Sequence, residues 1–141
     1  MRMTRNDLTE LLSSKGLKPT PSRLVILAAC AGETIPLDVH DVAGKVGDQV
    51  HLATVYRTLE KFVTVGLLER IDFQEGKFRY EFVHAHHHHA VCGNCGKVED
   101  VTDAGIEAIE SHIKKNSGFL VMKHTVELFG LCRNCQQRTH I

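Results

Sequence analysis

The sequence predicts an α+β protein with two parts, because three patterns follow one another along its 141 residues. Apolar residues first recur at helical spacing, up to about residue 65. They then alternate with polar residues between positions 67 and 83. Two CxxC pairs bracket the last third of the chain. We therefore expect residues 1–83 and 84–141 to form two small domains, the second built around a bound metal.

Four helices are predicted in the first part from their apolar stripes, and the first three also from an N-terminal capping residue. They begin near Thr4, Thr20, Asp38 and Leu52. Asp7 completes a capping box with Thr4, and Pro21 occupies the first helical position after Thr20. The fourth helix is expected over residues 52–65, with Gly66 ending it.

Strands follow at residues 67–73 and 78–83, joined by a turn at residues 74–77. Helices followed by a hairpin is the order of a winged helix-turn-helix, although other α+β domains share it. The second part is expected to contain a strand through the histidine run, a second strand near residues 98–101 and a helix over residues 103–116. A long strand over residues 119–131 should lead into the second CxxC, and the last six residues should be frayed.

Composition excludes several classes of protein. The 17 basic and 17 acidic residues balance, so any contact with nucleic acid must come from a local patch. The longest apolar stretch, residues 24–31, is too short to cross a bilayer, and the N-terminal segment lacks the apolar core of a signal peptide. We expect a soluble cytoplasmic protein with no membrane partner, in which CxxC thiols stay reduced.

The four paired cysteines are therefore predicted to hold a structural zinc ion. They are Cys92, Cys95, Cys132 and Cys135. Two CxxC turns present four thiolates, which fill a tetrahedral zinc site and leave no open position for chemistry. The alternative is a pair of reactive or redox CxxC motifs. Cys30 lies on an apolar helix face and is assigned to the core.

The run of four histidines that precedes the first CxxC offers more ligands than one structural zinc needs. In an extended strand, side chains alternate, so His86 and His88 face one way while His87 and His89 face the other. One strand can thus serve two sites. Further ligands are available at Glu81, Asp100, Glu107 and His124. The alternative is a solvated histidine patch with one weak adventitious site.

The fourth predicted helix has a polar face that suits contact with DNA. Thr54, Tyr56 and Arg57 lie opposite its apolar stripe, and Lys18 and Arg23 from the preceding segment are available for phosphates. Many amphipathic helices share this feature, so alone it is a weak signal.

Together, four segments resemble the ferric uptake regulator family of metal-dependent repressors. They are residues 16–27 (GLKPTPSRLVIL), 52–59 (LATVYRTL), 86–98 (HHHHAVCGNCGKV) and 118–132. The last segment matches at Gly118-Phe119, at His124 and at residues 129–132 (FGLC). The resemblance covers nearly the whole chain. It implies a homodimer with N-terminal winged helices and a C-terminal α/β dimerisation domain.

The resemblance also implies roles for particular residues. Lys18, Arg23, Tyr56 and Arg57 fall where the family contacts DNA, and Thr54 belongs to the same helix. Glu81, His87, His89 and Asp100 match a regulatory hinge site. His86, His88, Glu107 and His124 match a second metal site. Alternation of side chains along a strand sorts the histidines into the same two pairs.

The chain departs from the family at one sensor ligand, a histidine that the family commonly supplies just before the third helix. Pro36 lies at or beside that place, so the candidate replacements are Glu33, His40 or a water molecule. Besides the structural zinc, we expect a second divalent metal. Fe²⁺ is the first candidate, and Zn²⁺ or Mn²⁺ are the alternatives.

The expected function is a repressor that binds a palindromic operator in double-stranded DNA and controls metal-homeostasis or oxidative-stress genes. A peroxide-sensing repressor that uses bound iron is the alternative. A zinc-dependent hydrolase is disfavoured, because no nucleophile or phosphate-binding glycine loop accompanies the histidines. We expect no enzyme activity and no small-molecule substrate.

Overall fold

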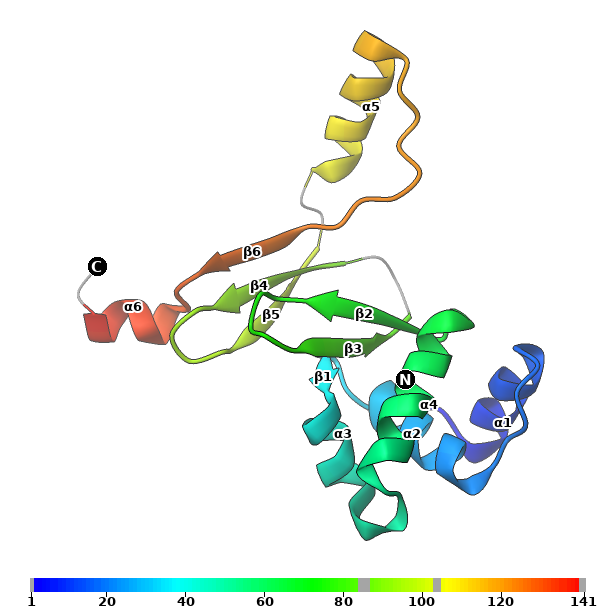
Figure 1. The fold of residues 1–141 in the computed structure, drawn as a ribbon. Coiled ribbons are helices and arrows are strands. Elements are labelled where there is room, and N and C mark those ends of the chain that lie inside the picture. Colours follow the sequence, from blue (N-terminus) through cyan, green and yellow to red (C-terminus); the bar gives the residue numbers. More distant parts are fainter. Residues whose placement is uncertain (1, 84–86, 103–104, 140–141) are drawn as a thin grey trace. The chain divides into compact units, whose positions relative to one another are not determined.

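The computed structural model describes residues 2–83, 87–102 and 105–139, and the chain divides into two compact units, Met1–His84 and Ala85–Ile141 (Figure 1). Both units combine helices with a three-stranded sheet, so the predicted α+β class is confirmed. Within the described ranges, no helix has the length and apolarity needed to span a membrane.

The first unit contains four α-helices, a short 3-10 turn and three strands. In chain order they are α1 (Arg5–Ser14), α2 (Pro21–Ala31), β1 (Leu37–Asp38), α3 (Val39–Val46), η1 (Gly47–Gln49), α4 (Leu52–Thr64), β2 (Leu68–Asp72) and β3 (Phe78–Phe82). The strands form an antiparallel sheet in the order β1-β3-β2. This is the helix and hairpin order of a winged helix-turn-helix.

All four helices begin where predicted, and side-chain hydrogen bonds cap three of them; α4 begins at Leu52 with no side-chain bond from His51. Thr4 N–H donates to Asp7 Oδ2 at 2.8 Å and Asp7 N–H donates to Thr4 Oγ1 at 3.1 Å, which completes the capping box. Asp38 and Asp41 form the same reciprocal pair at the start of α3. Gly66 follows α4 with φ +83°, a conformation that glycine adopts without steric cost.

One apolar core holds the helices of the first unit together. Its fully buried side chains come from every long helix, and they include Leu12, Leu27, Val42, Leu59 and Phe62. Helix α2 packs against α4 and β3, and α4 packs against β2. The stripe that predicted α4 is therefore the face that positions this helix, and its opposite face is exposed to solvent.

The second unit has a three-stranded sheet with β4 at its centre. Its elements are β4 (His88–Cys92), β5 (Val98–Val101), α5 (Ile106–Ser117), β6 (Glu127–Gly130) and α6 (Arg133–Thr139). Strand β4 pairs antiparallel with β5 and parallel with β6.

Two predictions for the second unit were wrong. The strand expected over residues 119–131 exists only as β6, because β4 offers partners only to Glu127–Gly130 and residues 119–126 lie beyond its end. The C-terminus expected to be frayed forms α6 through Thr139. The predicted helix over residues 103–116 is observed as α5, and positions 103 and 104 lie outside the described residues.

Candidate metal centres and nucleic-acid interface

The four paired cysteines come together at one end of the second sheet. Cys92 ends β4 and Cys95 follows in the turn, while Cys132 and Cys135 lie after β6. A hydrogen bond from Gly93 N–H to Gly130 O at 2.8 Å continues the pairing of these two strands. The parallel pairing of β4 with β6 thus brings together two motifs that are far apart in sequence.

The sulfur atoms have the spacing of a tetrahedral site. All four Sγ atoms lie within 4.8 Å of one another, and Cys95 Sγ is 3.8 Å from Cys132 Sγ. A zinc ion with Zn–S bonds of about 2.3 Å separates its ligand sulfurs by about 3.8 Å. None of the four forms a disulfide. The cluster therefore fits a closed zinc site.

Hydrogen bonds prepare at least one of these thiols for a metal. Backbone N–H groups of Cys132 and Cys95 lower the pKa of the Cys92 thiol to about 6, which favours the thiolate. Asn94 Nδ2 donates to Cys135 Sγ at 3.2 Å and so orients a second ligand. By contrast, burial raises the pKa of Cys30 to about 12, as expected for a core thiol.

A second cluster of side chains that can bind metal lies at the start of β4 and on its partner strand β5. One ligand-type atom from each of His87, His89 and Asp100 lies within 4.8 Å of the others. The two imidazole centroids are 4.8 Å apart, and His87 Nε2 is 4.0 Å from Asp100 Oδ1. His89 faces Asp100 across the β4–β5 ladder. Imidazoles with a carboxylate suit zinc, iron, manganese, nickel or cobalt.

Glu81, the fourth predicted member of the hinge site, belongs to the first unit. It lies in β3, opposite Glu69 of β2, and is 5% exposed. A carboxylate this deeply buried needs a compensating partner or a bound cation.

The other two histidines of the second expected site also meet. The His88 and His124 ring centroids are 5.3 Å apart, so successive histidines of the run face different neighbours, as the period of two predicts. His124 Nδ1 is hydrogen-bonded to Glu110, a residue that the sequence analysis missed. Glu107 is exposed in the first turn of α5, and His86 lies outside the described residues.

The two candidate residues for the missing sensor ligand have different surroundings in the first unit. Glu33 forms an ion pair with Lys45, whereas His40 is exposed on α3. The ion pair gives the Glu33 carboxylate a partner within its own unit.

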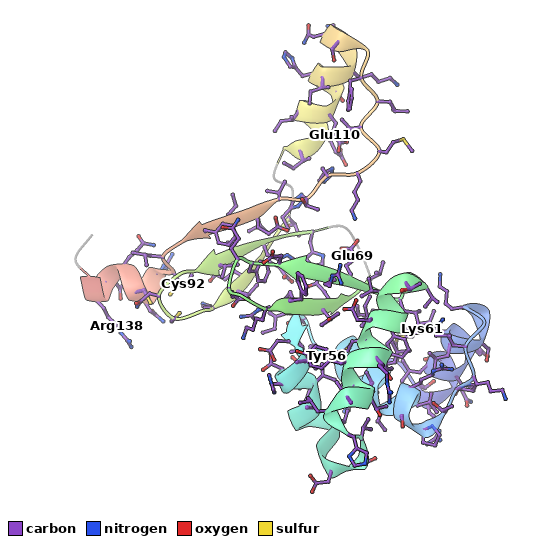
Figure 2. All side chains as sticks on the ribbon, in the orientation of Figure 1. Tyr56, Lys61, Glu69, Cys92, Glu110 and Arg138 are labelled. Carbon is purple, nitrogen blue, oxygen red and sulfur yellow. The ribbon has the colours of Figure 1, made fainter. Side chains whose placement is uncertain are left out.

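A basic groove runs between α4 and the segment that begins α2. Its volume is about 670 Å³, and its lining consists of Lys18, Thr20, Ser22, Arg23, Thr54, Arg57, Thr58 and Lys61. Four of these side chains are cationic, and none of the described lining residues is acidic. Four predicted DNA-contact residues line the groove. The fifth, Tyr56, is 48% exposed on another part of α4, and Figure 2 labels it together with Lys61.

Thr20, Ser22, Thr58 and Lys61 line this groove but were not among the predicted DNA contacts. A signal was present, because residues 54, 57, 58 and 61 follow the i, i+3, i+4, i+7 spacing of one helix face. What the pattern lacked was the opposite wall, which α2 supplies.

Comparisons with known proteins identify a family and several similar chains. The model of the ferric uptake regulator family matches residues 14–129. A ferric uptake regulation protein from Yersinia pestis is 34% identical over 139 residues, covering 93% of each chain. A peroxide operon regulator from Bacillus subtilis is 31% identical and covers 94% of this chain and 93% of its own.

A solved structure extends the similarity to three dimensions. The ferric uptake regulator from Pseudomonas aeruginosa with manganese superposes with a TM-score of 0.74 at 31% identity, covering 93% of this chain and 99% of its own. A family match over most of the chain, together with relatives above 30% identity at nearly full length, is sufficient evidence of membership. The chain belongs to the ferric uptake regulator family.

Proposed function

We propose that this protein is a metal-responsive transcriptional repressor that binds double-stranded DNA as a homodimer. One observation carries the proposal. The protein has a basic surface suited to DNA, and it also has a cluster of metal ligands that leaves coordination positions unfilled. The first unit presents the basic groove beside Tyr56, and the second presents His87, His89 and Asp100 in addition to the closed cysteine site.

The two kinds of metal site have different roles. Four thiolates saturate a zinc ion, so the cysteine site supports folding of the second unit. The histidine and aspartate cluster supplies only part of a coordination shell, and a divalent ion bound there has room for a further ligand. Glu81 is our candidate for that ligand.

Glu81 gives the metal a way to influence DNA binding. It follows Tyr80 in β3 of the first unit, whereas the other three ligands belong to the second. An ion held by both groups restricts the orientations of the DNA-binding unit. Without it, specific affinity falls in proportion to the fraction of molecules in the competent orientation.

The exposed apolar side chains of the second unit support the homodimer. Helix α5 buries none of its residues, and large apolar side chains are exposed at Ile109, Phe119, Leu120, Met122, Leu128 and Phe129. A second copy would cover this surface and place two DNA-binding units on successive half-sites of a palindromic operator. His86, His88, Glu107 and His124 remain our candidates for the second site beside it.

Fe²⁺ is our first candidate for the regulatory ion, with Mn²⁺ or Zn²⁺ as alternatives. Similarity to a peroxide operon regulator favours one variant of the proposal, in which bound iron reports peroxide. In that case, peroxide treatment of the iron form should add 16 Da to a histidine peptide. A zinc hydrolase, the alternative from another class, has no support in a family of transcription regulators.

Fluorescence anisotropy with a palindromic AT-rich duplex tests the proposal. The cysteine zinc is left in place while Fe²⁺, Mn²⁺, Ni²⁺ and Zn²⁺ are titrated separately. We expect binding to saturate with at least one of these metals. Equal binding with and without every added metal would exclude the sensing role.

A further inference from the structure

The basic groove contains one cation, Lys61, that the predicted DNA contacts do not include, and its lining extends along α4. Lys61 comes from the last turn of α4, Thr54 from the first, and Arg57 lies between them. At 1.5 Å per residue, the distance from Thr54 to Lys61 along the helix axis is about 10 Å. The residues that α4 contributes to the groove therefore lie in a row along the helix and do not surround a single position.

The opposite wall continues the same chemistry. Lys18 and Arg23 bring two more cations, and Thr20 and Ser22 bring hydroxyl groups. Arg23 Nη1 donates to Lys18 O at 3.2 Å, which fixes its guanidinium beside the segment that leads into α2. Thr20 Oγ1 is occupied by the N–H of Arg23.

This distribution favours an extended polyanion over a single phosphate group. A pocket for one phosphate concentrates its donors around one position. The two cations on α4, Arg57 and Lys61, are four residues apart, about 6 Å along the helix axis, and the lining of this wall extends about 10 Å in all. Successive phosphates of one DNA strand lie farther apart along the strand than the 3.4 Å rise measured along the duplex axis, so this length accommodates about two phosphates.

We propose that the groove between α2 and α4 is a track for the backbone of one DNA strand, and that Lys61 is a phosphate contact at its end. The proposal rests on the DNA-binding function proposed above and adds a residue to it. Tyr56, which lies outside the groove, is left for contact with base edges.

Lys61 is well suited to a test because it can be changed without disturbing the fold. Its side chain is exposed on α4, and exposed substitutions of this kind seldom alter stability much. Lys61→Gln removes one charge and keeps much of the side-chain length. Lys115→Gln is the matched control, since Lys115 is also exposed, in the last turn of α5 in the other unit.

The experiment measures the binding of the metal-loaded protein to duplex DNA over a series of salt concentrations. Each lost phosphate contact reduces the slope of log affinity against log salt by about 0.9. We expect Lys61→Gln to show this loss, with the same fold-weakening on an operator-like duplex and on an unrelated duplex. Lys115→Gln should keep the wild-type slope.

The outcomes separate this inference from the proposed function. If the wild-type protein binds no duplex, the DNA-binding function itself fails. If it binds and Lys61→Gln keeps the full salt slope, the function stands and the track is wrong. A loss confined to the operator-like duplex would also overturn it, because it would assign Lys61 to base contact.

A competitor tests the shape of the groove independently. Inorganic phosphate, added at an ionic strength matched with chloride, should displace DNA no better than chloride does. Specific displacement by inorganic phosphate would identify a single-phosphate pocket and contradict the track.

Discussion

Tyr80 Oη donates a 2.5 Å hydrogen bond to Glu60 Oε2 and thereby joins strand β3 to helix α4. The same carboxylate accepts from Arg70 Nη1 of β2 at 2.8 Å. Burial, followed by the bond to Glu60, raises the pKa of Tyr80 above its usual range, so the phenol remains a donor. One glutamate on α4 thus holds both strands of the hairpin.

Tyr80→Phe should destabilise the first unit while leaving its core filled. The ring is 3% exposed and belongs to the apolar core, so phenylalanine keeps the packing and removes only the hydroxyl. Because Glu60 is partly exposed, we expect a loss of about 1 kcal/mol in the free energy of unfolding. Urea unfolding measures it. Tyr56→Phe is the control, and equal losses in both variants would mean that the bond to Glu60 contributes nothing.

Cys132→Ser should release the zinc ion and unfold the second unit. Three thiolates bind zinc less well than four, and a structural zinc site contributes directly to folding. Metal content by mass spectrometry and helix content by circular dichroism provide the readouts. Cys30→Ala should retain its zinc because Cys30 lies in the core of the first unit. Full zinc retention by Cys132→Ser would refute the four-thiolate site.

Glu81→Gln should weaken the response of DNA binding to metal without unfolding the protein. The substitution removes the proposed ligand charge in β3 and conserves side-chain shape. Glu69→Gln is a close control, since Glu69 lies directly opposite Glu81 in the β2–β3 ladder and is exposed. The concentration of metal that gives half-maximal DNA binding should rise for Glu81→Gln alone. His89→Gln should act in the same direction, and an unchanged metal response in both variants would rule out the hinge site.

Glu110→Gln should weaken metal binding at the site that contains His124. The Glu110 carboxylate holds Nδ1 of His124, and loss of such an orienting group typically reduces metal affinity by about 10–100-fold. Competition with a chromophoric chelator measures the affinity. Glu107→Gln should also weaken the site as the expected ligand. An effect of Glu107→Gln without any effect of Glu110→Gln would remove Glu110 from the site.

Acid should destabilise the first unit partly through Asp38. Burial alone would raise the pKa of Asp38, but the hydrogen bond and charge of Lys77 and the N–H of Asp41 outweigh it and lower that pKa. Its stabilising contribution is therefore complete above the unfolded-state pKa of about 3.9 and is lost as the pH falls through the folded-state value. Asp38→Asn, which can still cap α3, should flatten this part of the stability profile. The exposed Asp48→Asn should not, and identical profiles for both variants would contradict the assignment.

Local patterns predicted the helices of the first unit well. Thr4 and Asp7, or Asp38 and Asp41, are three residues apart, so the groups that form each capping box meet as soon as the helix starts. The hairpin strands and the division of the histidines between two faces also follow from short-range periodicity.

Elements that depend on distant partners were missed or misjudged. The two residues of β1 form a strand only because Leu37 pairs with Tyr80 and Asp38 with Arg79. The apolar residues after Gly118 look like one long strand, yet pairing with β4 exists only over Glu127–Gly130. Sequence patterns contain no measure of where a partner strand ends.

The sequence by itself determined the ligand types, the CxxC spacing and the polar stripe on α4, because these depend on residue identity and helical or strand period. Only the tertiary structure brought Cys92 and Cys95 to Cys132 and Cys135, placed Glu110 against His124, and set the α2 segment opposite Lys61. These contacts join residues far apart in the chain. Their partners are selected by sheet pairing and by burial of the shared core, which no local pattern specifies.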